Sequence, residues 1–218
     1  MKHTLQADSI FFEVSGRNIL KGGWMMAETG SIVALFGRNG CGKSSLLNVI
    51  YGSLTAESGT TRIDGQYLKV PYQHPHLLRY LPAYSFTPPG LTVRRVLADY
   101  GITQALLLRE FPEFTDRLQQ RVGSFSSGER RLLEILLVVM SNSAFVMLDE
   151  PFLYLSPIHA EKVLQLIQSR KAQTGFIITD HQYELLFPAA DTKMVLVNGQ
   201  MSVVHTPADL EASGYIKL

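Results

Sequence analysis

The stretch 36–45, "FGRNGCGKSS", decides the fold of this chain. Four residues separate Gly37 from the Gly42–Ser44 tripeptide "GKS", which is the spacing of a P-loop. An apolar run typical of a buried strand, "SIVALF" (31–36), precedes the loop, and a helical pattern, "GKSSLLNVIYG" (42–52), follows it. Glycines let backbone amides converge on phosphate oxygens, and the helix N-terminus adds its positive dipole. The stretch therefore predicts a phosphate-binding loop between a strand and a helix.

Two side chains of this loop have the chemistry for a nucleotide triphosphate. Lys43 can reach the β- and γ-phosphates, and the Ser44 hydroxyl can ligate Mg²⁺. The other loop residues predicted to surround the nucleotide are Gly37, Arg38, Asn39, Gly40, Cys41, Gly42 and Ser45. The alternative is a plain glycine turn that enters a helix and leaves the lysine exposed, but the strand before the loop and the helix after it favour the phosphate site. Cys41 could act as a redox switch, although a small tolerated side chain is the favoured interpretation.

A second apolar run ends in two adjacent acids. "AFVMLDEP" (144–151) places Asp149 at the end of a predicted buried strand, where carboxylates of α/β sheets face the ligand crevice. Asp149 is suited to hold Mg²⁺, and Glu150 is suited to orient and polarise an attacking water. A strand that simply ends in solvated acids is the alternative, and the upstream P-loop makes it the weaker one.

Composition sets limits on the class of protein. The chain has 218 residues, of which 46% are hydrophobic and 18% charged, which excludes a disordered chain. A net charge of +1 gives no support to a nucleic-acid-binding role. The single cysteine excludes an internal disulfide. "MKHTLQADSI" lacks the apolar run of a signal peptide, and the strongest apolar stretch, 132–140, is too short to span a bilayer. The sequence predicts a soluble protein that reaches a membrane only through a partner.

The order of predicted elements indicates an α/β fold. Two antiparallel strands lie around "SGRN" (15–18), buried strands alternate with helices, and a hairpin is centred on Asn198–Gly199. Alternating strands and helices predict a mostly parallel sheet covered on both faces. We expect one domain over 1–218, with a core of about 1–82 and 141–218 and an inserted helical part of about 83–140.

The segment "SFSSGERRLLEILLVVM" (124–140) is the most informative one after the P-loop. Ser126 and Glu129 have the spacing of a capping box at the start of a helix. Such a helix start also leaves backbone amides and a positive dipole in front of it, which favours a phosphate there.

The order of these motifs, followed by "IITDHQ" (177–182), resembles the ATP-binding cassette (ABC) ATPases over essentially the whole chain. "GERR", "DEPF" and "TDH" are similar to the branch that serves lipopolysaccharide export and branched-chain amino-acid import. The resemblance implies a P-loop NTPase, RecA-like core with an antiparallel β subdomain and an inserted α-helical subdomain. It makes 125–129 the signature motif, in which Ser126 and Gly128 contact phosphate while Ser127 and Glu129 replace a glycine and a glutamine. It also makes His181 the switch histidine at the γ-phosphate.

The resemblance further implies a mechanism that needs two chains. The P-loop of one copy and the signature helix of another enclose each ATP, in a homodimer or in a heterodimer with a second ABC ATPase. Separate membrane-spanning transporter subunits would dock beside Ala83, where the apolar residues Tyr84, Phe86, Pro88 and Leu91 follow. The alternative is that these four side chains pack inside the helical part. The expected location is cytoplasmic and peripheral, on the inner face of the cell membrane, with ATP and Mg²⁺ bound and no nucleic acid.

Three positions depart from the family pattern. Ala83 stands where the Q-loop glutamine is expected, and Ser156 stands where the family has a carboxylate that helps communication across the dimer. The aromatic residue that stacks on adenine falls at Val14, so Phe12, two residues earlier, is the candidate substitute. With the γ-phosphate residues intact and these couplings altered, we expect a competent but slow ATPase.

Two other functions fit parts of the sequence. A soluble regulatory ABC protein, not coupled to transport, is compatible with the missing Q-loop glutamine, but the chain has neither a second cassette nor long coiled coils. A small P-loop kinase would leave "FSSGERR" and "TDH" unexplained. The ATPase subunit of a membrane transporter remains the leading prediction.

Overall fold

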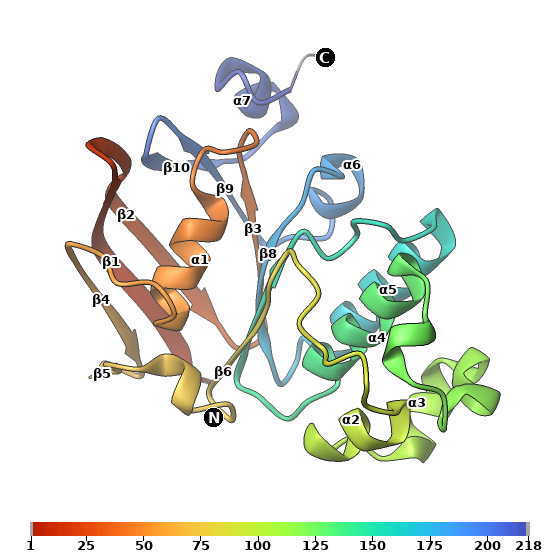
Figure 1. Ribbon diagram of the computed structural model, residues 1–218. Coiled ribbons are helices and arrows are strands. Elements are labelled where there is room, and N and C mark those ends of the chain that lie inside the picture. Colours follow the sequence, from red (N-terminus) through yellow and green to blue (C-terminus); the bar gives the residue numbers. More distant parts are fainter. Residues whose placement is uncertain (1, 217–218) are drawn as a thin grey trace.

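The computed structural model describes residues 2–216 and arranges them around two sheets (Figure 1). A four-stranded antiparallel sheet, on the left of the figure, faces a six-stranded sheet across helix α1 (Lys43–Tyr51). A group of helices covers the other face of the six-stranded sheet, on the right. The predicted α/β fold is confirmed.

The antiparallel sheet has the order β2-β1-β4-β5. Its strands are β1 (Thr4–Val14), β2 (Arg17–Glu28), β4 (Ser58–Ile63) and β5 (Gln66–Tyr67). The pair β1–β2 is longer than the sequence pattern indicated, and its register shifts at three places. These shifts conceal the full length of the pair from a search for strict alternation, because each one moves the following side chains to the other face.

The six-stranded sheet has the order β10-β9-β3-β8-β7-β6. Its strands are β3 (Ile32–Phe36), β6 (Leu78–Leu81), β7 (Phe145–Asp149), β8 (Gly175–Thr179), β9 (Thr192–Val197) and β10 (Gln200–Val204). All neighbouring pairs are parallel except the terminal hairpin β9–β10. The carboxyl ends of β3, β7 and β8 therefore meet at one edge of the sheet, which is where the predicted site residues follow.

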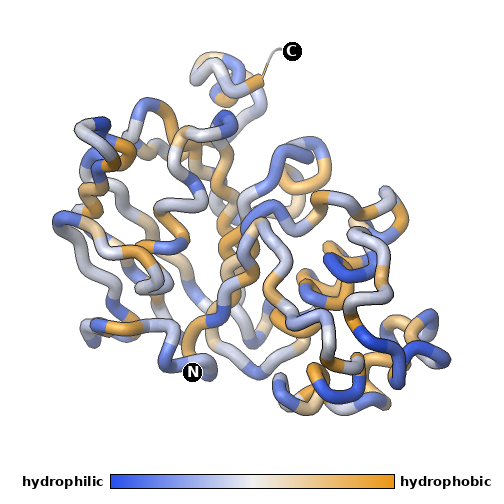
Figure 2. The backbone as a smooth tube through the Cα atoms, in the orientation of Figure 1, coloured by the Kyte–Doolittle hydropathy of each residue, from blue (hydrophilic) through white to orange (hydrophobic). Residues whose placement is uncertain are grey.

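Both faces of this sheet are buried, which explains why its strands are continuous apolar runs. Along β3, Val33 and Leu35 pack with α1 and the antiparallel sheet, whereas Ile32, Ala34 and Phe36 pack with the helices on the opposite face. Figure 2 shows hydrophobic residues concentrated along the central strands and hydrophilic residues at many of the outer turns.

The remaining α-helices come from the middle and from the C-terminal part of the chain. They are α2 (Val93–Asp99), α3 (Gln104–Glu110), α4 (Ser127–Val139), α5 (Pro157–Arg170), α6 (Tyr183–Leu186) and α7 (Pro207–Ala212). Short 3₁₀ turns occur at Pro71–Gln73, Pro112–Arg117 and Val122–Ser124. Helix α7 lies beyond the last element that the sequence pattern indicated. Among residues 2–216, no helix is long and apolar enough to cross a membrane.

Candidate nucleotide-binding and hydrolysis site

The P-loop connects β3 to α1 as predicted, and two of its glycines, Gly37 and Gly42, are sterically required. Gly37 has φ +153°, and a Cβ there would lie 2.6 Å from Cys41 Sγ and 2.8 Å from Leu196 O. Gly42, the N-cap of α1, has φ +112°, and a Cβ there would lie 2.8 Å from Ile19 Cγ2. Only glycine lets the loop pass this close to its neighbours at a positive φ. The loop thus keeps its backbone next to whatever lies in front of α1.

The side chain of Lys43 forms hydrogen bonds with backbone carbonyls of its own loop. Its side chain is buried, and Nζ donates to Gly37 O at 2.6 Å and to Arg38 O at 3.3 Å. Ser44 is exposed and Ser45 is half-buried on the first turn of α1. An ammonium group held at the loop carbonyls lies at the helix N-terminus, where the dipole and the charge together favour an anion.

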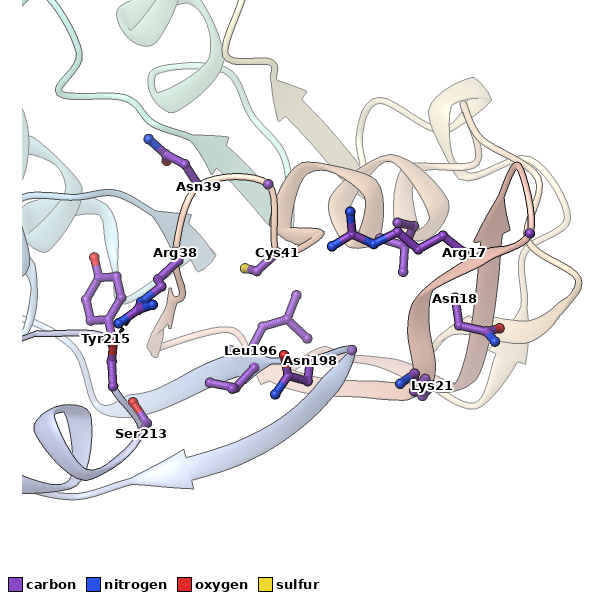
Figure 3. A pocket seen from close by; sticks show the side chains of 16 residues that line it. Arg17, Asn18, Lys21, Arg38, Asn39, Cys41, Leu196, Asn198, Ser213 and Tyr215 are labelled. Atoms are coloured by element: carbon purple, nitrogen blue, oxygen red, sulfur yellow. Dashed lines mark hydrogen bonds between the residues drawn. The ribbon is translucent and has the colours of Figure 1, made fainter.

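A cavity of about 860 Å³ opens on one side of the P-loop (Figure 3). Arg38, Asn39, Gly40 and Cys41 line it from the loop. The other walls are the β1–β2 hairpin (Gly16–Ile19 and Lys21), the β9–β10 hairpin (Leu196–Gly199) and the segment after α7 (Ser213–Tyr215). Figure 3 shows the side chains of Arg17 and Cys41 on the same side of this space. Polar and cationic groups surround a space next to the phosphate loop, and Asp149 and Glu150 do not line it.

The segment after α7 is attached to the P-loop, a contact that the sequence analysis missed. Arg38 Nε donates to Gly214 O at 2.8 Å, and the rings of Tyr215 and Phe36 lie 5.8 Å apart. Tyr215 Oη donates to Asp180 O at 3.3 Å, and burial raises the Tyr215 pKa to about 12. A local sequence pattern cannot predict hydrogen bonds between residues this far apart in the sequence.

Asp149 lies at the carboxyl end of β7 and is buried. Its Oδ1 accepts from Thr179 Oγ1 at 2.6 Å, and its Oδ2 accepts from Tyr80 Oη at 3.1 Å. Asn48 Nδ2 donates to the same Tyr80 oxygen at 3.2 Å. Burial, and then the charge of Asp149, raise the Tyr80 pKa, so the phenol stays a neutral donor. Neutral donors from β6 and β8 thus fix the carboxylate without neutralising its charge, and Asn48 of α1 holds the Tyr80 hydroxyl in turn.

Glu150 has an unusual backbone conformation directly after the strand. Its φ is +49°, in the left-handed region that residues with a side chain rarely adopt. The Glu150 amide donates to Thr179 O at 2.8 Å, and Glu150 Oε1 lies 3.0 Å from His181 Nε2. The structure therefore brings together the two residues for which the sequence analysis predicts catalytic roles, at the ends of the neighbouring strands β7 and β8.

The signature segment has the capping box that its spacing predicts. The Ser126 hydroxyl accepts from the Glu129 amide at 3.3 Å, and Glu129 Oε2 accepts from the Ser126 amide at 2.9 Å. The Ser126 amide, and then its hydroxyl and Arg117, hold the pKa of Glu129 below its usual range. Gly128 is again required, because a Cβ there would lie 2.7 Å from Tyr154 O.

Ser126, Ser127, Gly128 and Glu129 do not line the cavity beside the P-loop. Ser127 lines a separate pocket of about 200 Å³ together with Ala83, Arg131, Glu134 and Tyr154. Within one chain, the signature motif and the P-loop cavity are therefore distinct places.

The position of Phe12 contradicts the prediction that it stacks on adenine. Its side chain is only 8% exposed, packs in the core beside α1, and does not line the cavity. Val14, two residues on, is exposed, because the β1–β2 register shifts between Phe12 and Glu13. Counting in steps of two along the strand therefore gave the wrong face. The cavity wall includes Arg17 and Asn18 at the start of β2.

The structure shows where Ala83 and Ser156, two of the positions that depart from the family pattern, are located. Ala83 follows β6 and lines the smaller pocket. Ser156 is the N-cap of α5, where its hydroxyl accepts from the His159 amide at 3.3 Å. Ser156 therefore has a structural role of its own at the start of that helix.

With this geometry, the fold and site define a P-loop nucleotide-binding protein. The sequence profile described as ABC transporter matches residues 20–153. The chain is 34% identical, over 83% of its length and 83% of the relative's, to the high-affinity branched-chain amino acid transport ATP-binding protein BraG of Pseudomonas aeruginosa. It is 25% identical, over 98% of its length and 95% of the relative's, to the lipopolysaccharide export system ATP-binding protein LptB of Escherichia coli. The chain belongs to the ABC transporter family and is an ATP-binding ATPase subunit.

Solved structures agree with this fold. An ATP-binding subunit of an ABC transporter superposes with a TM-score of 0.85 at 24% identity, covering 97% of this chain and 93% of the other. A bacterial Atm1-family ABC exporter with ATP bound superposes with a TM-score of 0.84 at 21% identity, covering 97% of this chain and 40% of the exporter chain. The resemblance inferred from the motif order is confirmed.

Proposed function

We propose that this chain hydrolyses Mg²⁺-ATP with Glu150 as the residue that orients and deprotonates the attacking water. The observation that carries the proposal is the contact between Glu150 and His181, 3.0 Å apart, at the edge where the P-loop also begins. The carboxylate accepts a proton from the water as the water oxygen attacks the γ-phosphorus and the bond to the bridging oxygen breaks. His181 would donate a ring N–H to the γ-phosphate of a bound ATP.

The phosphates would lie on the P-loop. Lys43 Nζ would exchange its contacts with Gly37 O and Arg38 O for phosphate oxygens, which accept stronger charge-assisted hydrogen bonds. The base would enter the neighbouring cavity, next to Arg17 and Asn18 at the start of β2. A guanidinium can stack on a purine as an aromatic ring does, which offers a substitute for the missing aromatic residue.

Ser44 and Asp149 are the residues that would hold Mg²⁺. Within residues 2–216, no group of three or more His, Cys, Asp or Glu side chains is arranged to hold a metal by itself. A magnesium ion would take a hydroxyl, a nearby carboxylate and the remaining oxygens from nucleotide and water. Bound Mg²⁺ would neutralise charge on the phosphates.

We further propose that the complete site forms between two copies, or between this chain and another ABC ATPase. The separation of the signature motif from the P-loop cavity within one chain supports this arrangement. In a closed pair related by a two-fold axis, each Ser126–Glu129 helix start faces the nucleotide on the other chain.

Transport requires a membrane partner. The similar proteins are named as ATP-binding components of amino acid transport and lipopolysaccharide export systems, and we propose the same kind of role, peripheral on the cytoplasmic face, with separate membrane-spanning subunits. The docking region would lie along 83–91. Tyr84 is 69% exposed and Pro88 is exposed, whereas Phe86 and Leu91 partly pack on the core. Tyr84 and Pro88 are thus the side chains available for contact.

Glu150→Gln tests the proposed chemistry. The amide keeps the size of the side chain but cannot take the proton, so ATP should bind with parent affinity while phosphate release falls at least about a hundredfold. Binding is measured by calorimetry and turnover by phosphate release. Glu161→Gln, an exposed acid on α5, is the matched control and should turn over like the parent. Ordinary turnover by Glu150→Gln would remove Glu150 from the proposed role.

A further inference from the structure

Arg131 makes a set of contacts that the proposed chemistry does not use. It lies in the first part of α4, two residues after the signature motif, and is 4% exposed. Its Nη1 donates to Pro82 O at 2.7 Å, and its Nη2 donates to Asp149 O at 2.6 Å and to Glu150 O at 2.9 Å. One buried guanidinium therefore connects a helix of the middle region to two segments of the core.

The contacts to Asp149 and Glu150 act on the backbone that carries the proposed base. The Glu150 amide is held by Thr179, and the carbonyls on either side of the Glu150 Cα are held by Arg131. A φ of +49° at a residue with a side chain persists only where the surroundings fix it from several directions. Arg131 and Thr179 together supply that fixation, and the direction of the Glu150 side chain depends on it.

The contact to Pro82 reaches the segment where the family pattern is broken. Pro82 O belongs to the peptide that precedes Ala83, the position at which a glutamine is missing. An alanine side chain cannot transmit a hydrogen bond from this segment to the nucleotide. The backbone carbonyl beside it already contacts a group that touches Glu150. Movement of α4 or of the Ala83 segment must therefore displace a guanidinium that holds the Glu150 backbone.

We propose that Arg131 is a positioning residue that couples the placement of α4 and of the Ala83 segment to the orientation of Glu150. The hydrogen bonds from Arg131 to backbone carbonyls replace the link that a Q-loop glutamine side chain would provide. The inference rests on the role proposed for Glu150. Desolvation lowers the pKa of Arg131, with nearby carboxylates, Glu134 first, acting in the opposite direction. An arginine remains charged through such a shift, and its planar fork suits several carbonyls at once.

Arg131→Ala with guanidinium rescue tests the coupling. Misplacing Glu150 should lower kcat between about tenfold and a hundredfold, while KM for ATP stays near the parent value because the P-loop is untouched. Guanidinium ion in the millimolar range should restore part of the lost kcat, since it can enter through the pocket of about 200 Å³ that Arg131 lines. Arg131→Lys should fall between parent and Arg131→Ala, because one ammonium cannot span the three carbonyls.

Arg170→Ala is the matched control. Arg170 is also partly buried and donates to one backbone carbonyl, Met140 O, at 3.3 Å, but it lies on α5 away from β7. Its kcat should equal that of the parent and should not respond to guanidinium. The inference is overturned if Arg131→Ala has the same kcat as the parent. It is also overturned if guanidinium restores none of the kcat that folded Arg131→Ala has lost.

A double variant separates this inference from the proposed function. If Arg131 acts through Glu150, Arg131→Ala should cause no further loss of turnover in a Glu150→Gln background. Further loss there contradicts a route through Glu150 even when Glu150→Gln itself is inactive. Full activity of Glu150→Gln alone would instead contradict the proposed function. If Arg131→Ala does not fold, Arg131→Lys, compared with Arg170→Lys, provides the same test of kcat against KM.

Discussion

At the scale of single residues, three charged side chains near the site form hydrogen bonds with backbone groups. Lys43 is held by carbonyls of its own loop, and Glu129 accepts from a helix start. Arg131 donates to three carbonyls at the end of two core strands. Each charge thereby fixes a loop or a helix end that borders the site. Loss of one such side chain is expected to act first on local geometry and through it on function.

Lys43→Ala should lower ATP affinity at least about tenfold, because a charge-assisted contact to phosphate contributes on the order of 1.5–3 kcal/mol. Calorimetric titration with ATP measures the effect. Lys162→Ala removes a lysine from a surface ion pair with Glu113 and should bind ATP like the parent. Unchanged affinity in Lys43→Ala would mean that the P-loop does not hold the phosphates.

Residues with a local signature could be predicted, and residues defined by distant partners could not. The P-loop, the Asp149–Glu150 pair and the capping box are each recognisable from spacing within a short stretch. Phe12 was misassigned because a register shift in a β-pair leaves no mark in the sequence. The partners of Arg131 lie 49, 18 and 19 positions away. The one sign in the sequence is that Arg131, a charged residue, directly precedes the apolar run Leu132–Leu133. A charged side chain that is buried with such a run needs a buried partner.

At the scale of elements, the N-cap role of Ser156 explains how a serine can stand where the family has a carboxylate. Serine and aspartate are about equally good N-caps, so the start of α5 is satisfied by either residue. The loss of the carboxylate therefore need not cost stability. Any consequence of the substitution should be sought in communication between two chains.

Ser156→Ala and Ser156→Asp should separate these two effects. Without a cap, Ser156→Ala should lose about 1 kcal/mol of unfolding free energy, whereas Ser156→Asp should stay within about 0.5 kcal/mol of the parent. Urea unfolding followed by circular dichroism measures both. A loss in Ser156→Asp equal to that in Ser156→Ala would contradict the capping role.

The elements that sequence patterns indicated best are those buried on one side or both. Strands β3, β7 and β8 are short apolar runs, and α4 follows a capping box, so their types could be predicted. The contacts of the segment after α7 with the P-loop could not, since they pair Arg38 with Gly214 and Tyr215 with Asp180. Such contacts depend on the topology that brings β9 beside β3.

At the scale of the whole molecule, the two features proposed to bind phosphate lie in different places on one chain. The P-loop borders the larger cavity, and the signature helix borders the smaller pocket. The start of the signature helix does not line the P-loop cavity of its own chain, which fits a site completed by a second chain. The motif order predicts the fold and a site shared by two chains, whereas the walls of the cavity beside the P-loop depend on contacts between distant parts of the chain.

Ser127→Glu in the Glu150→Gln background tests this two-chain site. Ser127 is exposed and is the first residue of α4, so a carboxylate there should stabilise the helix through its dipole by about 0.3–1 kcal/mol. The same carboxylate should repel a phosphate that arrives on another chain. Glu150→Gln alone should accumulate an ATP-dependent dimer, visible by light scattering on a sizing column. Ser127→Glu should abolish that dimer while its own P-loop still binds ATP. Ser127→Gln, similar in size but neutral, is the control and should keep part of the dimer. A dimer of parent strength in Ser127→Glu would show that the signature helix does not face the nucleotide of a second chain.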